Sequence, residues 1–288
     1  MNEIVIKMKD GLEVYCLYSK IDNPKGVVQI IHGMCEHKER YIELMDKLNK
    51  AGYNCIASDL RGHGKSINNE YVFGYTGDYS LLVSDQYEIT SFLKKDNPTI
   101  PIDIFAHSMG TLIARMYIKD YDNEIRRLIL SGTVCYNGGA KLAVLISKMK
   151  KKNKSSKLLF AFTNGFSFKE DYSWLSYNKE NIENYINDPL CGFRFKNIGY
   201  KALFSMVRDL HKLKAFKCQN KALKILMLSG CDDRTTGGTK GLTEVLKTFN
   251  KIGYSDIRIK EYYQMKHEII NEDNKAEVFV DILQFLGN

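Results

Sequence analysis

The stretch that decides the fold is IDIFAHSMGTLIARMYIK, residues 102–119, where a short apolar run passes through a tight turn into a helical pattern. The apolar run ends at Ala106, Ser108 lies in the turn, and Gly110 follows it. The spacing small-x-Ser-x-Gly at the end of a strand is typical of a turn that pushes a serine side chain outward as a nucleophile. The same serine stands where an ordinary helix takes its N-cap residue, so both interpretations of Ser108 are open.

The rest of the chain repeats this alternation of short apolar runs and longer helical patterns. Strands are predicted at residues 4–7, 12–17, 27–31, 53–58, 102–106, 127–131, 225–229 and 257–262. Helices are predicted at residues 41–49, 79–94, 109–121, 242–249 and 275–285. Strands joined through helices imply right-handed crossovers and a mostly parallel sheet with helices on both faces.

The alternation stops between residues 135 and 215, where no strand pattern is present. That region holds amphipathic helical pieces and a lysine-rich run. We therefore expect one α/β core in two parts, residues 1–134 and 216–288, with a helical cap formed by residues 135–215 inserted between two strands of the sheet.

Composition excludes most other classes of protein. With 288 residues, 44% of them apolar and 26% charged, the chain has the composition of a globular protein with one large core. Its net charge of +8 is moderately basic. No zinc-finger spacing, RNA-binding motif or basic recognition helix accompanies that charge, so we expect no nucleic-acid partner.

The cysteines and the N-terminus predict a reduced, cytoplasmic protein. The cysteines are odd in number, scattered and without a C-x-x-C pair, which argues against a disulfide framework or a structural zinc site. They are Cys16, Cys35, Cys55, Cys135, Cys191, Cys218 and Cys231. The first residues carry charges at Glu3, Lys7 and Lys9 and do not resemble a signal peptide. No apolar run approaches the roughly 18 residues that a membrane span needs.

A serine nucleophile needs a base to accept its proton and a carboxylate to orient that base. His267 follows the last predicted strand and so lies at the same edge of the sheet as Ser108, which makes it the favoured base. The alternative is a surface-loop histidine. His107 is adjacent to the serine, and its side chain is expected to point away and support the turn. The remaining histidines are His32, His37 and His63 in early loops and His211 in the helical insertion.

Two aspartates compete for the orienting role. Asp232 and Asp233 both follow the strand predicted at 225–229, and their spacing does not decide between them. A solvated turn would also favour aspartate there. Acyl transfer further requires backbone donors for the developing oxyanion. The N–H of Met109 is one candidate, and the N–H of Met34, in the glycine-containing loop IHGMCEH, is the other.

At this point the motifs resemble those of a known family. The segments HGMCEHKERY (32–41), SDLRGHGKS (58–66) and AHSMG (106–110) are similar to loops of monoacylglycerol lipases and bacterial lysophospholipases. SGCDDR (229–234) and KHE (266–268) resemble the stretches that carry their acid and base. Within the insertion, DYSWLSYNKENIENYINDPLCGF (171–193) resembles the cap of bacterial members.

The resemblance covers nearly the whole chain in the right order. It implies an α/β-hydrolase fold with a helical cap, a Ser-Asp-His order along the chain, and catalysis without a metal or organic cofactor. Matched position by position, it implies Ser108 as nucleophile, Asp233 as acid and His267 as base, with oxyanion donors at Met34 and Met109. Two residues depart from the family pattern, because Cys35 and Ala106 each stand where the family has glycine.

The insertion also suggests how a substrate is reached. Apolar residues lie beside seven lysines between positions 141 and 157, a combination that can rest on an anionic lipid surface. The alternative is a cap helix packed over the site with solvated lysines. The apolar residues are Leu142, Val144, Leu145, Ile146 and Met149. Phe160, Phe162, Phe166 and Phe168 are expected either to line an acyl-chain pocket or to form the core of the cap.

The leading hypothesis is a serine hydrolase that cleaves small-molecule acyl esters, namely monoacylglycerols or lysophospholipids, in the cytoplasm or peripheral to a membrane. One alternative is an aminopeptidase of the proline-iminopeptidase type, which would need an acidic cluster to grip a free amine. Dehalogenase and epoxide-hydrolase chemistry would need an aspartate at position 108. A further alternative is a non-catalytic binding protein on the same fold, although every member of the expected triad is present.

Overall fold

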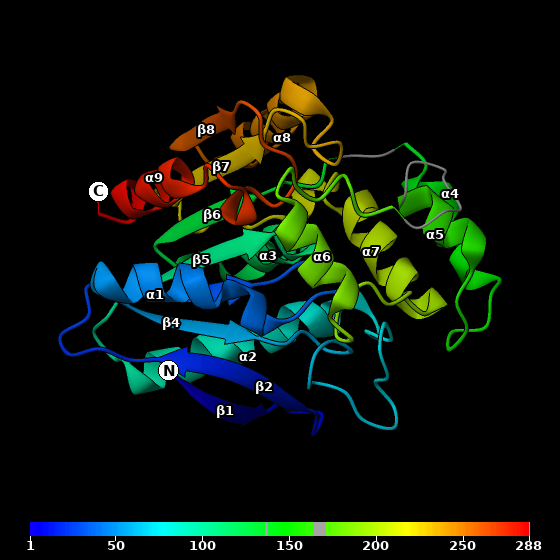
Figure 1. The fold of residues 1–288 in the computed structure, drawn as a ribbon, viewed down its shortest axis with the longest axis horizontal. Helices are drawn as coiled ribbons and strands as arrows, with labels where there is room; N and C mark the ends of the chain where they lie inside the picture. Colours follow the sequence, from blue (N-terminus) through cyan, green and yellow to red (C-terminus); the bar gives the residue numbers. More distant parts are fainter. Residues whose placement is uncertain (136–137, 164–170, 288) are drawn as a thin grey trace.

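The computed structural model describes residues 1–135, 138–163 and 171–287 (Figure 1). Its central feature is an eight-stranded sheet in the order β1-β2-β4-β3-β5-β6-β7-β8. The strands are β1 (Asn2–Lys7), β2 (Glu13–Ser19), β3 (Gly26–Ile31), β4 (Tyr53–Ser58), β5 (Ile102–His107), β6 (Arg127–Ser131), β7 (Lys224–Gly230) and β8 (Ile257–Tyr262). Each predicted strand is present, with ends that differ from the prediction by at most two residues.

The sheet is mostly parallel, as the sequence predicts. β1 and β2 form an antiparallel hairpin, and β2 pairs antiparallel with β4. From β4 through β3, β5, β6 and β7 to β8 all neighbouring strands are parallel. The central strands β3, β4, β5 and β6 are buried along their whole length, which explains why their sequences are nearly continuous apolar runs.

Helices cover both faces of this sheet (Figure 1). They are α1 (Ile42–Lys50), α2 (Tyr79–Asp96), α3 (Met109–Tyr121), α4 (Ala140–Lys148), α5 (Lys157–Thr163), α6 (Lys179–Asn187), α7 (Asn197–Asp209), α8 (Gly238–Ile252) and α9 (Ala276–Gly287). Short 3₁₀ turns occur at Lys38–Tyr41, Asp122–Glu124, Leu213–Ala215 and Ile269–Asn271. α1 and α9 share one apolar core with the sheet, while α2, α3 and α8 belong to the core on the opposite face.

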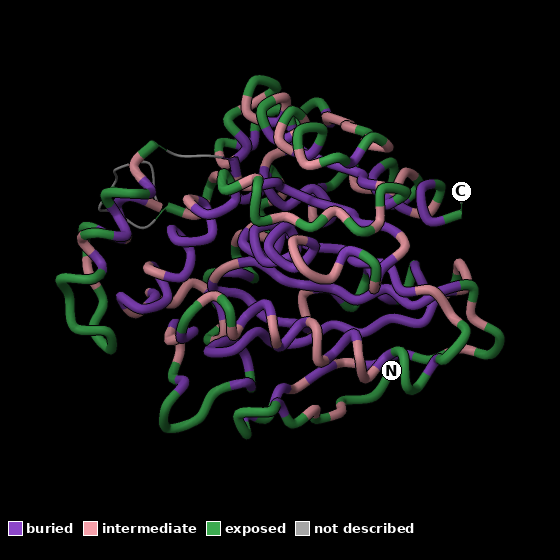
Figure 2. Tube along the Cα trace, turned by 180° about the vertical axis from the view of Figure 1, so that it is seen from behind, coloured by how far each residue is buried: buried purple, intermediate pink, exposed green. Residues whose placement is uncertain are grey.

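Four helices, α4 to α7, lie between β6 and β7 in the chain, within the region where the sequence shows no strand pattern. They gather at the carboxyl ends of the parallel strands, on the right in Figure 1. α4 and α5 pack against α7. Figure 2 shows that the central strands are buried, whereas the outer end of this group, around α4 and α5, is mostly exposed. Ligands of open α/β sheets bind at the carboxyl ends of the strands, so these helices cover the edge where a site is expected.

None of the helices in the described ranges is both long enough and apolar enough to cross a lipid bilayer.

Candidate active site

Ser108 lies between the end of β5 and the start of α3, in a backbone conformation that residues other than glycine rarely adopt. Its φ of 51° is positive, and its ψ is −121°. The turn is held because the Ser108 N–H donates to the carbonyl of Ser131 (3.0 Å) and the Ser108 carbonyl accepts from the N–H of Thr111 (2.8 Å). Ser108 occupies the N-cap position, yet its side chain makes no capping hydrogen bond. The strained turn therefore presents the hydroxyl instead of using it to cap the helix.

Two glycines allow the chain to close around this turn. A Cβ on Gly110 would lie 2.3 Å from the carbonyl oxygen of Ile31, so only glycine lets α3 approach β3 this closely. A Cβ on Gly33 would lie 2.9 Å from the Cβ of Ser108. The loop after β3 and the serine turn are consequently in direct contact.

His267 and Asp233, predicted from the sequence as base and acid, meet in the structure. The Nδ1 atom of His267 lies 2.9 Å from Oδ2 of Asp233. Both side chains are buried, with 1% and 0% of their surface exposed. Asp232 is exposed and instead accepts a hydrogen bond from the hydroxyl of Tyr177 (3.0 Å). The geometry thus brings Asp233, and not Asp232, to the histidine.

Thr235 completes this arrangement, and no motif in the sequence pointed to it. Its N–H and its hydroxyl both donate to Oδ1 of Asp233, at 2.8 Å each. The same hydroxyl lies 3.1 Å from Nδ1 of His267. Thr235 therefore fixes the carboxylate so that its second oxygen faces the imidazole.

Charge and burial act in opposite directions on this pair. Burial disfavours both charged forms, which by itself raises the pKa of Asp233 and lowers that of His267. The mutual attraction and the hydrogen bonds outweigh burial, so the pKa of Asp233 lies below its usual range and that of His267 above it. An ionised Asp233 only accepts, so the proton of a neutral His267 resides on Nδ1 and leaves a lone pair on Nε2.

The Nε2 atom of His267 is buried and has no hydrogen-bond partner among the described residues. Ser108 and His267 line the same cavity, although no direct hydrogen bond joins Ser108 Oγ to Nε2. Bonds of this kind often tighten only when substrate is present. Gly132 makes room for the ring, because a Cβ there would lie 2.9 Å from its Cε1 and Nδ1 atoms.

Two aromatic rings pack close to the imidazole of His267. The ring of His107 lies 4.7 Å from that of His267, and the ring of Trp174 lies 4.8 Å away. Burial, assisted by His267, lowers the pKa of His107 to about 4, so His107 is neutral and packs beside the base. This is the supporting role expected for His107. Trp174 belongs to the segment between α5 and α6.

The two residues expected to supply the oxyanion donors are both next to the cavity. Met34 and Met109 line it beside Ser108. Met109 is the first residue of α3, and first-turn N–H groups have no acceptor within their own helix. The N–H of Met34 makes no hydrogen bond to another described residue, whereas the preceding N–H, of Gly33, donates to Oε1 of Glu36 (2.5 Å).

The cavity holds about 370 Å³ and its walls are mostly apolar. Its apolar lining includes Phe160 and Phe162 of α5 and Leu203, Phe204 and Val207 of α7. Trp174, Leu175, Asp171, Arg234 and Thr235 also line it, and of these Trp174 and Thr235 contact His267. Phe166 and Phe168, which were also expected in a pocket or cap core, lie outside the described residues.

The two departures from the family pattern differ in their consequences. Cys35 has a φ of 59°, in the left-handed region that glycine adopts without strain. Its thiol donates to the carbonyl of Phe193 (2.8 Å), which ties the loop after β3 to the segment after α6. Ala106 is buried within β5 with an ordinary backbone. The strain in this site therefore lies at Cys35 and Ser108.

Among the described residues, two side-chain groups have the composition and spacing to hold a metal ion, and both contain His37. The first adds Asp188 and Cys191, and the second adds Glu39 and Asp59. Both ring nitrogens of His37 already have partners, Nδ1 with Glu39 (2.6 Å) and Nε2 with Asp188 (2.7 Å). These ion pairs account for the proximity of the carboxylates without an ion.

Comparisons with known proteins agree with the geometry. The family model "Serine aminopeptidase, S33" matches residues 22–274. A monoacylglycerol lipase from Mycolicibacterium smegmatis is 25% identical over 279 residues, which is 95% of this chain and 92% of the relative. A phospholipase from Bacillus subtilis is 25% identical over 264 residues, covering 90% and 94% of the two chains.

Among solved structures, a highly thermostable carboxyl esterase from Bacillus coagulans, in complex with glycerol, has a TM-score of 0.87 at 24% identity, covering 99% of this chain and 97% of its own. That likeness shows the α/β-hydrolase fold. The family model spans most of the sequence and includes every predicted site residue. The chain therefore belongs to the serine aminopeptidase S33 family of α/β-hydrolases, and the family predicted from its motifs is confirmed.

Proposed function

We propose that this α/β-hydrolase is a serine esterase that cleaves carboxylic esters of lipid-like substrates, monoacylglycerols or lysophospholipids. The observation that carries the proposal is the apolar cavity, which holds Ser108 and His267 together with the ring of Trp174 on one wall. Apolar pockets with a few convergent polar groups bind apolar ligands and orient one reactive bond. Two relatives that match most of the chain, a monoacylglycerol lipase and a phospholipase, support the same reaction class.

In the proposed mechanism, Nε2 of His267 takes the proton of Ser108 as Oγ attacks the ester carbonyl. Asp233 holds Nδ1–H and stabilises the imidazolium that forms. The N–H groups of Met34 and Met109 stabilise the oxyanion. His267 then protonates the departing alcohol, and a water molecule, activated by the same histidine, releases the fatty acid from Ser108.

In this proposal, residues 135–215 form the cap over the site. We place the acyl chain along the phenylalanines of α5 and α7, which line the cavity. We place the departing alcohol beside His267 and Trp174, where the guanidinium of Arg234 lies 4.4 Å from the centre of the Trp174 ring. This division matches a substrate with an apolar tail and a polar head.

The direct test is Ser108→Ala, assayed with p-nitrophenyl esters and with a fluorophosphonate probe that labels activated serines. We expect turnover to fall at least about 10⁴-fold and labelling to disappear, because the variant lacks the nucleophile. Ser84→Ala, on α2, is the matched control and keeps both signals, since its hydroxyl only donates to the carbonyl of Leu81. Turnover or labelling that survives in Ser108→Ala contradicts the proposal, and absent labelling of the wild type favours a non-catalytic binding protein.

An aminopeptidase of the proline-iminopeptidase type is the second candidate, because acidic residues do line the cavity. Glu36 and Glu268 both reach it. However, both are already paired with Arg40, at 2.8 and 2.7 Å, which weakens their attraction for a substrate amine. A panel of lipid esters and aminoacyl p-nitroanilides, compared by kcat/KM, separates the two. Higher values for the anilides would replace the esterase proposal.

Arg234 offers a way to tell the two lipid substrates apart. Its guanidinium lies 4.4 Å from the centre of the Trp174 ring, and both residues line the cavity on the side of the base. A phosphate on the leaving group would be attracted to this cation, whereas glycerol would not. Arg234→Met is expected to lower kcat/KM for lysophospholipids by about tenfold and to leave monoacylglycerols within about twofold. Equal effects on both substrates would contradict this role.

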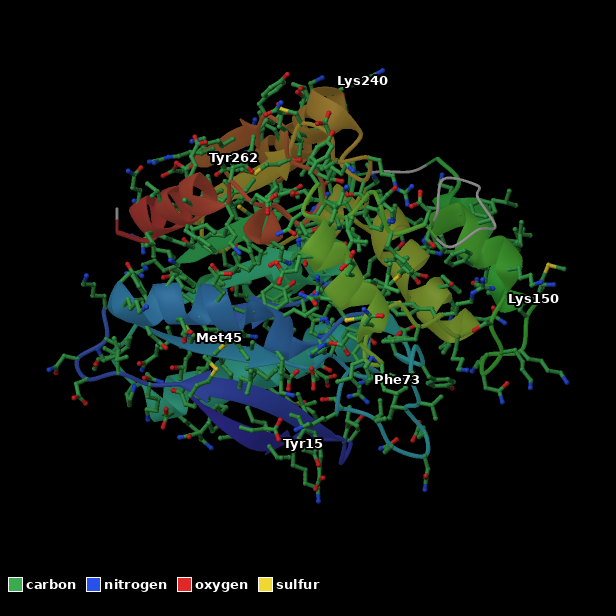
Figure 3. The ribbon with its side chains drawn as sticks, viewed as in Figure 1. Tyr15, Met45, Phe73, Lys150, Lys240 and Tyr262 are labelled. Carbon is green, nitrogen blue, oxygen red and sulfur yellow. The ribbon has the colours of Figure 1, made fainter. Side chains whose placement is uncertain are left out.

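Peripheral contact with an anionic membrane is part of the proposal. Leu142, Leu145 and Met149 are 53%, 56% and 79% exposed, beside seven exposed lysines. Those lysines are Lys141, Lys148, Lys150, Lys151, Lys152, Lys154 and Lys157. Figure 3 shows Lys150 at the outer end of the cap, away from the sheet. We expect co-sedimentation with anionic vesicles at low salt and much less with neutral ones, and equal sedimentation with both would contradict it.

A further inference from the structure

Three charged side chains, Glu36, Arg40 and Glu268, form a buried cluster beside the proposed base; we call it the ion clamp. One guanidinium nitrogen of Arg40, Nη1, donates to Glu36 Oε2 and to Glu268 Oε1, at 2.8 Å each. The other, Nη2, donates to Glu268 Oε2 at 2.7 Å. The side chains of Arg40, Glu36 and Glu268 are 11%, 4% and 3% exposed. Two-pronged contacts of this kind fix direction as well as distance.

The ion clamp joins the oxyanion loop to the loop of the base. On one side, Glu36 Oε1 accepts from the N–H of Gly33 (2.5 Å) and from the hydroxyl of Tyr41 (3.0 Å). This bond holds the N–H of Gly33, one residue before Met34, and the N–H of Met34 faces the developing oxyanion in the proposed mechanism. On the other side, Glu268 directly follows His267. A shift of one loop is therefore transmitted to the other through Arg40.

The cap takes part in the same cluster. The side-chain amide of Asn181, on α6, donates to Glu268 Oε2 (2.7 Å) and its oxygen accepts from Arg40 Nη2 (3.2 Å). The ring of Tyr185, one turn later on α6, lies 4.9 Å from the guanidinium carbon of Arg40. Its hydroxyl donates to the carbonyl of Cys35 (2.9 Å), in the oxyanion loop. Three separate segments of the chain thus meet at one arginine.

The cluster also carries charge. Two carboxylates and one guanidinium leave a net charge of −1, buried next to a histidine that becomes an imidazolium during the reaction. Lys266 precedes His267 in the chain, but its ammonium group donates to the carbonyl of Ser173 (2.6 Å). Among the described residues, the other side chains in contact with the His267 ring are Asp233 and Thr235 from the loop after β7, His107 from β5 and Trp174 from the segment before α6. Of these, only Asp233 is charged when His107 is neutral. In a buried site, the second negative charge is weakly screened.

We propose that Glu36, Arg40 and Glu268 are positioning residues of the esterase, which lock the oxyanion loop to the base loop and stabilise the imidazolium form of His267. This inference rests on the proposed function of Ser108 and His267. It assigns the cluster two separable effects. One is the fixed geometry of the loops, which depends on the forked shape of arginine, and the other is the net negative charge.

The two effects are separated by kcat and by the pH at which activity is half-maximal on the acid side. Glu268→Gln and Glu36→Gln remove a negative charge, and both carboxylates hold the pKa of His267 up. We expect kcat to fall about tenfold to a hundredfold and the midpoint to move to lower pH. Arg40→Lys keeps the charge but loses the fork, so kcat falls while the midpoint stays in place.

Glu39→Gln is the matched control, because Glu39 lies in the same loop but pairs with Lys38 and His37. It is expected to keep the wild-type midpoint. Wild-type kcat in Arg40→Lys, or an unmoved midpoint in both glutamine variants, would overturn the inference. Circular dichroism identifies any variant that fails to fold, and the folded variants then decide whether the inference holds.

Ser108→Ala in the same assay distinguishes this inference from the proposed function. If wild-type turnover depends on Ser108 while the ion-clamp variants behave as wild type, only this inference fails.

Discussion

The two halves of the helical insertion are attached to the rest of the molecule in different ways. The anchored half, residues 171–193 with α6, is fixed by buried charged groups. Glu272, 1% exposed, accepts from the hydroxyl of Ser176 (2.6 Å), from the N–H of Tyr177 (2.9 Å) and from the N–H of Lys266 (2.8 Å). These bonds join the segment before α6 to the loop that carries His267, in addition to the contacts of the ion clamp.

The outer half, residues 140–163 with α4 and α5, is attached mainly by apolar packing. Ala140, Ala143 and Val144 are buried, and α4 and α5 pack on α7. The loop after α4 is held through its backbone, because the Asn197 side chain donates to the carbonyl of Lys151 (2.8 Å). The exposed residues of this half include the apolar and lysine residues already described, and Figure 2 shows this part of the chain as mostly exposed.

This difference in attachment indicates which part of the proposed cap can move. Charge-assisted hydrogen bonds to a buried carboxylate have narrow geometry, so the anchored half keeps Trp174 against His267. Apolar packing of a short helix tolerates displacement at lower cost. We therefore expect substrate to enter by displacing the outer half, while the anchored half stays with the base.

The largest effect on stability is expected for Glu272→Gln in the anchored half. The amide replaces one of the two acceptor oxygens by an NH₂ group that faces other donors, so one or more buried donors lose their acceptor. The expected loss of unfolding free energy is about 3 kcal/mol, measured by urea denaturation. Glu277→Gln is the control, since that carboxylate is exposed and pairs with Lys260. It is expected to cost under about 1 kcal/mol. Similar losses in both variants would mean that the anchored half is not held through Glu272.

A smaller, pH-dependent effect is expected at His37, which joins the core to the anchored half through Asp188. Burial lowers the pKa of His37, but the carboxylates of Glu39 and Asp188 outweigh it, and the pKa lies above its ordinary value. The folded state therefore binds this proton more tightly than the unfolded state. Its contribution is fully present below about pH 6.5 and is lost as pH rises through the folded pKa.

The test compares wild type with His37→Gln by urea denaturation between pH 6 and pH 9. We expect the wild type to be more stable by about 1 kcal/mol at pH 6, with a difference that shrinks as pH rises. His211→Gln is a suitable control, because burial lowers the pKa of His211 and its pH dependence has the opposite sign. A His37→Gln difference that is constant across this range would refute the role of the protonated imidazole.

Much of this architecture was predictable because it depends on local patterns. Apolar runs of the central strands and the strand-to-helix turn at Ser108 identified the sheet and the edge where the site lies. The order of Asp233 and His267 after the insertion then placed both at that edge. Which of the two aspartates contacts His267, and at what distance, depends on the path of the loop after β7 and on Thr235.

What the sequence did not reveal involves partners far apart in the chain. Arg40 and Glu268 are separated by 228 positions, and nothing in local periodicity links a charged residue of one loop to that of another. Both residues lie in the motif loops 32–41 and 266–268. Charged residues within these mostly buried loops were the one sequence feature that could have indicated an ion pair between them. Ala106 and Cys35 both stand where the family has glycine, but only Cys35 has a positive φ, because the loop needs a left-handed residue and the strand does not.

The smallest effect on stability, paired with a large effect on binding, is expected in the outer half. Replacing Leu142, Leu145 and Met149 by serine creates no cavity in the core, since these side chains are already 53%, 56% and 79% exposed. Unfolding free energy is expected to change by less than about 0.5 kcal/mol per substitution. Co-sedimentation with anionic vesicles is expected to fall at least about tenfold, while turnover of a water-soluble p-nitrophenyl ester stays within about twofold.

The control is Ile186→Ser on α6, where the wild-type side chain is equally exposed, at 56%. This variant is expected to keep vesicle binding. If Ile186→Ser abolishes binding as effectively, the two halves meet the membrane together, and the distinction between an anchored and a displaceable half does not extend to lipid.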